Sequence, residues 1–256
     1  MPIPAISDIP LHVLMAVPCI VLLGYTIFGA TGFGSSIISV PGLSHFFPLA
    51  FTVPLITATD AFASTSTALR LRRLVAWREI RRLLPSQLIG IALGATLLLN
   101  LPRTPALLAL GIFATCYGAY VLTGAHRLAR APGWLVWPVG VVGGVFSALF
   151  GTGGPVYVIY LSARLPDKAE LRATTAIVVA ISVWIRLVLF LGTGLLLNRT
   201  LLLMVLLILP TMALGLWLGN RLHHALSGRG VLRLIAALLL ANGVALIGRA
   251  LGSLST

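Results

Sequence analysis

The stretch Gly29-Ala30-Thr31-Gly32-Phe33-Gly34-Ser35-Ser36 interrupts a long apolar segment in the first third of the chain, and Gly151-Thr152-Gly153-Gly154-Pro155 interrupts another just past the middle. Similar sequence follows each break. In a lipid bilayer an unpaired backbone N–H or C=O group is costly, so irregular backbone persists only where protein or a water-filled cavity shields it. Broken apolar segments at corresponding places in two halves are the best sequence indication of a transporter's binding site.

The composition places the chain among membrane proteins. Of its 256 residues, 59% are hydrophobic and 9% are charged, whereas a soluble domain carries about 25% charged residues. At least seven segments approach or exceed the length of a membrane-spanning helix, which is roughly 20 residues. These segments do not alternate apolar and polar residues as a transmembrane β-strand does. We therefore predict an all-α, polytopic helical membrane protein.

The formal net charge of +13 does not indicate nucleic-acid binding. Lysine and arginine collect in the cytoplasmic loops of membrane proteins, and the basic residues here lie mainly between apolar segments. Cys19 and Cys116 both fall inside apolar segments, and the sequence has no CxxC motif or His/Cys cluster. We expect no metal and no cofactor. The apolar segments also lack a nucleophile–base or metal-ligand pattern, so we do not expect an enzyme.

The basic segment Arg70–Arg82 is the strongest topological signal, and the positive-inside rule places it in the cytoplasm. If each glycine break joins a helical hairpin, the other basic groups fall mostly on the same side. If each break lies in a single crossing, several of them face outward, against the rule. The hairpin version therefore agrees better with the charges. It places these residues inside: Arg127, Arg130, Arg164, Lys168, Arg172, Arg221 and Arg229.

An internal duplication accompanies the two breaks. Residues 32–38 align with 151–157, and residues 84–94 align with 209–219 in the same order and at nearly the same separation. With one broken hairpin in each half, each half contains an odd number of passes. We therefore predict two inverted-topology repeats, one over residues 1–125 and one over residues 126–256, within one integral-membrane domain. The expected helices are 11–29, 34–47, 50–71, 83–101, 105–124, 134–150, 154–165, 171–197, 200–220 and 231–251.

The helices that begin after the breaks point to an anion site. The first N–H groups of a helix have no intrahelical acceptor and carry about half a positive charge from the macrodipole. Two such ends in a dry pocket near the membrane midplane would bind an anion. The alternative is close helix–helix packing, for which small residues are also suited. The candidate substrate-binding residues at the breaks are Gly32, Gly34, Ser35, Ser36, Gly153, Gly154 and Tyr157.

Two charged residues lie inside apolar segments. Arg186 shares one helix face with Thr175 and Ser182. A buried arginine must be paired or face a cavity, and its planar guanidinium suits an oxyanion, so Arg186 and Ser182 are further candidates. Asp60 could carry a coupling proton or form an ion pair with Arg186. Arg70, at the end of the same expected helix as Asp60, is a second possible partner, although it can also reach the interface.

The residues at both breaks resemble the sulfite exporter TauE/SafE family of bacterial membrane proteins. The resemblance runs through Gly24…Gly29-x-x-Gly32-Phe33-Gly34-Ser35…Val40-Pro41-Gly42-Leu43. It recurs in Gly143-Gly144…Ser147-Ala148-Leu149-Phe150-Gly151-Thr152-Gly153-Gly154-Pro155. It implies transport of sulfur oxyanions or organosulfonates across the inner membrane, typically as efflux. Ser35-Ser36 and Pro155 depart from the family's usual glycine run, so the hydroxyls could add anion donors or indicate a different substrate.

The sequence therefore leaves two classes of function to compare. The first is a secondary transporter, typically an exporter, of a small anion such as sulfite, sulfoacetate or another organosulfonate. Its partners would be the anion, the lipid bilayer and, if transport is coupled, protons; the oligomeric state is open. The second is a carrier or translocase of membrane lipids, which would need a lateral opening. A passive membrane scaffold would leave the buried Asp60 and Arg186 without a role.

Overall fold

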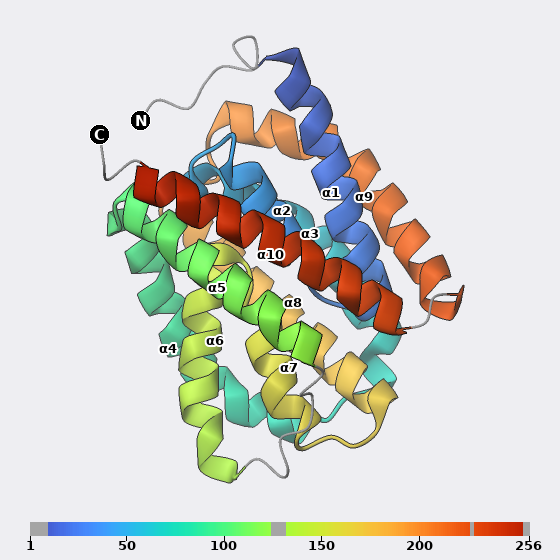
Figure 1. Ribbon diagram of the computed structural model, residues 1–256. Coiled ribbons are helices and arrows are strands. Elements are labelled where there is room, and N and C mark those ends of the chain that lie inside the picture. The colour runs from blue at the N-terminus through green and yellow to red at the C-terminus, as the bar shows by residue number, and fades with distance from the viewer. Residues whose placement is uncertain (1–9, 124–131, 226–227, 253–256) are drawn as a thin grey trace.

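The structure, a computed structural model, describes residues 10–123, 132–225 and 228–252 of the chain. Over these residues it is helical and contains no strand, which confirms the predicted all-α class. The longer helices are α1 (Leu11–Thr31), α3 (Leu49–Leu71), α4 (Trp77–Asn100), α5 (Arg103–Thr123), α6 (Val136–Phe150), α8 (Lys168–Gly192), α9 (Arg199–Ala225) and α10 (Gly228–Gly252). The short helices are α2 (Ser35–Ser44) and α7 (Gly154–Ser162), and single 3-10 turns η2 (Arg72–Leu74) and η3 (Gly133–Leu135) precede α4 and α6 (Figure 1).

Six helices of the described residues are long and apolar enough to cross a bilayer, namely α1, α4, α5, α6 with its preceding turn, α8 and α9. The sequence suggested at least seven such segments. Helix α3 has 23 residues but carries Asp60 and a row of threonines and serines. Helices α2 and α7 have 10 and 9 residues. At about 1.5 Å per residue, each covers about half of the roughly 30 Å hydrocarbon core, so neither crosses it alone.

Helix α4 begins at Trp77, six residues before the expected start at residue 83. Residues 78–82, four of which are charged, therefore lie on a helix, and the connection between α3 and α4 is shorter than the basic segment 70–82. Glu79 occupies the first turn, where a carboxylate is stabilised by the positive end of the macrodipole. Ile80 and Leu83 are buried on the inner face. The expected start at residue 83 left Glu79 outside the helix because the prediction followed hydropathy and not amphipathicity.

The helices pair across the two halves of the chain. Helix α1 packs on α9, α6 on α4, α3 on α8 and α5 on α10, and the α1–α9 and α5–α10 pairs lie side by side in Figure 1. A methyl group at Gly90 would meet Val141 O and Gly144, and one at Gly215 would meet Leu22 O and Tyr25. Under the alignment of the two halves, Gly90 corresponds to Gly215, and the residues that each methyl group would meet correspond as well. Each of the pairs α3–α8 and α5–α10 joins a helix of the first half to its counterpart in the second half. Such pairs are expected where a two-fold axis relates the two halves.

Basic groups from both halves meet at one end of the bundle. Arg70 and Arg221 line one cleft, and Arg164 forms an ion pair with Glu79. A single crossing at each glycine break would put residues 70–82 and 164–172 at opposite ends, so this ion pair favours the hairpin version. The positive-inside rule makes this end cytoplasmic. Arg127, Arg130 and the boundary near residue 125 lie outside the described residues, as does the side chain of Arg229.

Candidate functional site

Both glycine breaks end the preceding helix by the same backbone geometry. Gly32 and Gly151 adopt φ values of 85° and 72°, in the left-handed region that glycine occupies without strain. The N–H of Gly32 donates to Phe28 O, and the N–H of Gly151 donates to Ser147 O, at corresponding positions. Gly34 also has a positive φ, at 100°, immediately before α2. The backbone thus turns within a few residues, and the first turns of α2 and α7 lie near each other.

Asp60 on α3 holds the first turn of α2. Its Oδ1 lies 2.7 Å from the Ser35 hydroxyl and 2.8 Å from the Tyr25 hydroxyl. Its Oδ2 accepts from the Ser36 hydroxyl at 2.9 Å. The side chain is 3% exposed. Three hydroxyl groups therefore solvate the carboxylate inside the protein, and the two serines direct their O–H groups to Asp60.

Arg186 on α8 lies at the other side of the same region. Its side chain is 2% exposed, and Nη1 donates to the backbone carbonyl of Ser147 at 2.7 Å. The hydroxyls of Ser147 and Ser182 are 2.5 Å apart. Among the described residues Nε has no hydrogen-bond partner. A buried guanidinium with an unsatisfied N–H is costly unless another group accepts from it.

Asp60 and Arg186 do not form a direct ion pair. The described carboxylate–cation pairs within 4.0 Å involve Glu79 and not Asp60. Arg70 is exposed at the end of α3, ten residues from Asp60, which is about 15 Å along a helix. The two suggested ion-pair partners of Asp60 are therefore both out of contact. The negative and positive groups instead lie on opposite sides of the glycine breaks.

A small cavity lies at the glycine breaks and is lined by Asp60 but not by Arg186. A methyl group at Gly151, on its wall, would lie 2.7 Å from Ser36 Oγ and 3.4 Å from Arg186 Nη1. The Thr152 hydroxyl is buried without a partner among the described residues. The volume that a water-sized sphere can occupy is about 10 Å³, enough for about one water molecule. The lining residues are Phe28, Phe33, Gly34, Ser35, Ser36, Ile37, Asp60, Gly151, Thr152, Gly154, Pro155 and Val179.

The predicted site residues divide into two groups. Gly34, Ser35, Ser36, Asp60 and Gly154 line the cavity directly. The other predicted residues do not line the cavity: some contact the residues around it, and some lie elsewhere. Gly32 faces the side chain of Arg172, Gly153 packs against Gly143 and Ser147, and the Tyr157 ring covers Gly143. Ser182 supports Ser147, Arg186 reaches Gly151, and Arg70 is remote.

Sequence reasoning missed Tyr25, Ser147 and Thr152 as parts of the site. Tyr25 is fully buried and its hydroxyl contacts Asp60, 35 positions away along the chain. Ser147 contributes through its backbone carbonyl, a group that every residue carries. Thr152 lies inside the second glycine break, and its hydroxyl could have been noted beside those of Ser35 and Ser36. For Tyr25, an aromatic residue in an apolar segment gave no signal.

The sequence pattern of the sulfite exporter TauE/SafE family matches residues 16–246 of this chain. The chain belongs to this family. A relative, the probable inner membrane transporter protein TsaS of Comamonas testosteroni, is 33% identical over 175 residues, which are 68% of this chain and 73% of the relative. No solved structure matches the chain. Family membership and the six apolar helices identify a multi-pass inner-membrane protein.

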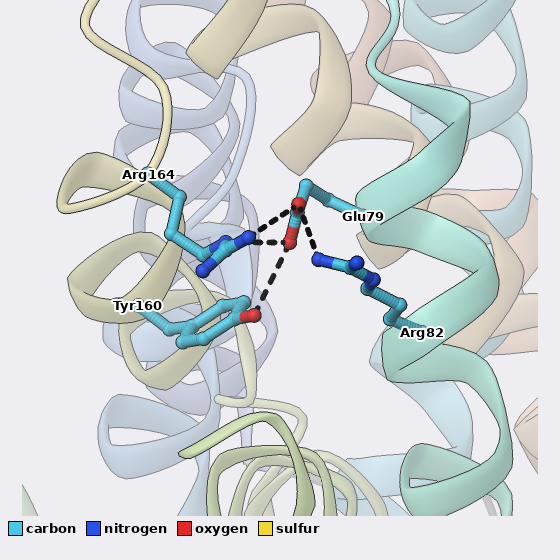
Figure 2. Close-up of polar contacts among 4 residues, drawn as sticks. All are labelled: Glu79, Arg82, Tyr160 and Arg164. Carbon is cyan, nitrogen blue, oxygen red and sulfur yellow. Dashed lines mark hydrogen bonds and ion pairs between the residues drawn. The ribbon is translucent and has the colours of Figure 1, made fainter. Parts of the chain in front are cut away.

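This TauE/SafE family member has a second polar cluster at its basic end (Figure 2). Arg164, just after α7, reaches Glu79 with Nε at 2.9 Å and Nη2 at 3.1 Å. Tyr160 on α7 donates to the same carboxylate at 3.1 Å, and Arg82 on α4 approaches it at 3.3 Å. The hydrogen bond to Glu79 raises the pKa of Arg164. The cluster ties the end of the short helix α7 to the start of α4.

We expect the Glu79–Arg164 pair to contribute more stability than the Glu79–Arg82 pair. The side chains of Glu79 and Arg164 are 9% and 24% exposed, whereas that of Arg82 is 38% exposed. A double-mutant cycle with Glu79→Gln and Arg164→Gln should give a coupling of about 1–2 kcal/mol, between the exposed and buried limits. The matched cycle with Arg82→Gln should give about 0.5 kcal/mol or less. Thermal unfolding in detergent measures both, and equal couplings would contradict the ranking.

The two left-handed glycines allow a second matched comparison. Alanine at either Gly32 or Gly151 should cost about 1–2 kcal/mol from the positive φ. At Gly32 the nearest atom is Arg172 Cγ at 3.5 Å, which leaves room for a methyl group, whereas at Gly151 Ser36 Oγ lies at 2.7 Å. We expect Gly151→Ala to abolish transport and Gly32→Ala to retain most of it. Transport assays on both folded variants test this, and equal losses would show that backbone strain alone is responsible.

Proposed function

We propose that this protein is a secondary transporter that exports a small sulfur-containing anion, such as sulfite, sulfoacetate or another organosulfonate. The observation that carries the proposal is the buried Arg186 beside the meeting point of two broken helices, since its Nε lacks a partner among the described residues. The unpartnered Thr152 hydroxyl on the cavity wall is a second donor. A planar guanidinium, a hydroxyl and helix N-termini together suit an oxyanion. Family membership supports the choice of sulfur chemistry.

The cavity in this conformation is closed to such an anion. Its volume of about 10 Å³ accommodates about one water molecule, so the anion would enter only after α2 or α7 moves. The two halves would be inserted in opposite orientations, and the antiparallel contact of α3 with α8 supports this. The indole N–H of Trp184 donates to the Thr65 hydroxyl, while Arg72, just after α3, lines one cleft with Ile177. Alternating access then follows from movement of one half against the other.

Export of a monovalent anion needs no coupled ion. Moving one negative charge out of an inside-negative cell releases about 2.3 kcal/mol per 100 mV. The membrane potential favours this direction because it drives a negative charge out of the cytoplasm. Asp60 would act as a fixed charge that positions Ser35 and Ser36, with proton coupling as the competing role.

The test is transport by purified protein in liposomes, with the membrane potential set by a potassium gradient. The panel contains sulfite, sulfoacetate, an aromatic sulfonate, sulfate and chloride. We expect potential-dependent flux of at least one sulfite- or sulfonate-bearing anion and none of chloride. Flux of chloride but of no sulfur anion would assign a different small anion, and movement of labelled phospholipid without anion flux would favour a lipid carrier.

Replacing Asp60 by asparagine separates its two possible roles. Asp60→Asn keeps the shape but removes the acceptor charge that three hydroxyls share. We expect transport to fall about tenfold or more, because the loss of a charged hydrogen-bond acceptor costs about 1.5–3 kcal/mol. The remaining flux should respond to an imposed pH gradient as the wild type does. If the wild type responds to the pH gradient and the variant does not, Asp60 is the proton carrier.

A further inference from the structure

A cleft of about 480 Å³ lies between α3 and α9, away from the cavity at the glycine breaks. Helix α3 contributes Phe62, Ser66 and Arg70 to it, and α9 contributes Ala213, Trp217 and Arg221. Each set has a spacing of four residues, so each lies along one helix face. Both sets run from small or apolar residues at one end to an arginine at the other.

The cleft is therefore amphipathic along its length. Phe62 and Arg70 are eight positions apart, a distance of about 12 Å along the helix. The apolar part is completed by Met212 and Leu216 on α9. Phe62 and Trp217 are 58% and 49% exposed. The apolar end thus opens on the outer surface of the bundle, where the acyl chains of the bilayer lie.

Among the residues that the structure describes, the basic end of the cleft has no counter-charge in its lining. Arg70 and Arg221 line it together with Asn220 and without any aspartate or glutamate. The described ion pairs involve neither arginine. The Arg221 guanidinium lies 4.1 Å from the centre of the Trp217 ring, which holds it over the cleft by a cation–π contact. Two guanidinium groups from different helices thus face one region at the predicted cytoplasmic surface.

We propose that this cleft binds one anionic phospholipid, with its phosphate between Arg70 and Arg221 and an acyl chain along Phe62 and Leu216. Basic pockets between transmembrane helices on the cytoplasmic side are suited to acidic headgroups. Guanidinium groups bind phosphate through two parallel N–H donors. A free phosphate would use the arginines but leave the apolar half of the cleft empty, so the length of the groove favours a lipid.

The bound lipid would support the helix that carries Asp60. Ala63 lines the lipid cleft, while Asp60 and Ser64 are buried on the inner side of α3. A lipid wedged between α3 and α9 would fix the spacing of these helices and so the position of Asp60. This role is independent of which anion the protein transports.

Native mass spectrometry with short-chain phosphatidylglycerol, and with phosphatidylcholine of the same chains, measures the binding directly. The variants are Arg70→Gln, Arg221→Gln and the double variant. Arg199→Gln is the matched control because it removes an exposed arginine at the opposite end of α9. An arginine near an anionic headgroup contributes about a fivefold change in affinity. We expect phosphatidylglycerol affinity to fall about fivefold in each single variant and about 25-fold in the double variant.

The control should change phosphatidylglycerol affinity less than about twofold. Phosphatidylcholine should bind more weakly than phosphatidylglycerol to the wild type and respond little to the variants. An equal loss in Arg199→Gln would show that overall charge and not this cleft is responsible, and would overturn the proposal. Displacement of the lipid by millimolar inorganic phosphate would assign a small-anion site instead. A change of oligomeric state in the double variant would assign the cleft to a second copy of the chain.

Discussion

Arg186→Ala is expected to abolish anion transport while leaving a folded protein. The guanidinium is 2% exposed, and its Nε has no partner among the described residues. Removing a buried charge that pairs with a bound anion costs about 2–5 kcal/mol of binding, or a factor of about 30 or more. The fold should survive, because the variant removes a desolvated charge, and the Ser147 carbonyl that accepts from Arg186 keeps its second donor, the N–H of Gly151.

Arg186→Lys is the matched variant for this test. Lysine keeps the positive charge but presents a point charge and not a planar fork, so binding should be intermediate between the wild type and Arg186→Ala. Anion binding by calorimetry and thermal unfolding of both variants separate recognition from folding. Wild-type transport by folded Arg186→Ala would refute anion capture by this residue. If the lysine variant binds the anion as well as the wild type, the positive charge of residue 186 and not its two-donor geometry is responsible for binding.

The helical fold was predictable because the apolar segments are long enough to span a bilayer as helices, and a spanning segment must satisfy its own backbone hydrogen bonds. The glycine breaks were also visible, since Gly32 and Gly151 interrupt apolar runs and adopt the positive φ that only glycine tolerates well. The start of α4 was wrong by six residues. Hydropathy detects only the apolar part of a helix. The first turns of α4 are amphipathic and carry Glu79, which is paired with Arg164, so hydropathy did not detect them.

The charged residues of the site were predictable, but their partners were not. Asp60 and Arg186 stand out because charges inside apolar segments are rare. A direct pair between them was the simplest expectation, yet Asp60 is satisfied by Tyr25, Ser35 and Ser36. The partner of Arg186 is a backbone carbonyl, which carries no sequence signal. The tertiary structure brings these groups together, and local patterns in one sequence do not reveal contacts between residues far apart along the chain.

The two interpretations of the glycines, ligand contact and close packing, apply to different positions: close packing is seen at several helix crossings, and ligand contact stays a prediction for the glycines that line the cavity. Gly34 and Gly154 line the cavity. Gly29 and Gly219 instead bring α1 and α9 together, as do Gly90 and Gly144 for α4 and α6. A methyl group at Gly29 would lie 2.9 Å from Gly219 Cα, and one at Gly90 would lie 2.9 Å from Gly144 Cα. Small residues at helix crossings allow this approach, and in a bilayer such packing is a main driving force for association.

Gly219→Leu should therefore prevent stable assembly of the two halves. A Cβ atom at this position would collide with the carbonyl oxygen of Thr26 and lie 2.8 Å from Gly29 Cα. Both obstacles are backbone atoms, so no side-chain rotation relieves them and α1 must move away from α9. Overpacking of this kind costs about 3 kcal/mol or more. Thermal unfolding in detergent and the yield of monodisperse protein measure the loss.

Gly248→Leu is the matched control, because Gly248 is exposed on α10 and a methyl group there would meet nothing within 4 Å. Its stability should change by less than about 0.5 kcal/mol. The repeat-equivalent variant, Gly94→Leu, should be as damaging as Gly219→Leu, since a methyl group at Gly94 would lie 2.9 Å from both Val145 Cα and Ala148 Cβ. If all three variants unfold alike, helix propensity or hydrophobicity and not the crossing determines stability. If Gly219→Leu alone is harmless, α1 and α9 do not pack as closely as α4 and α6, and the two halves are not equivalent.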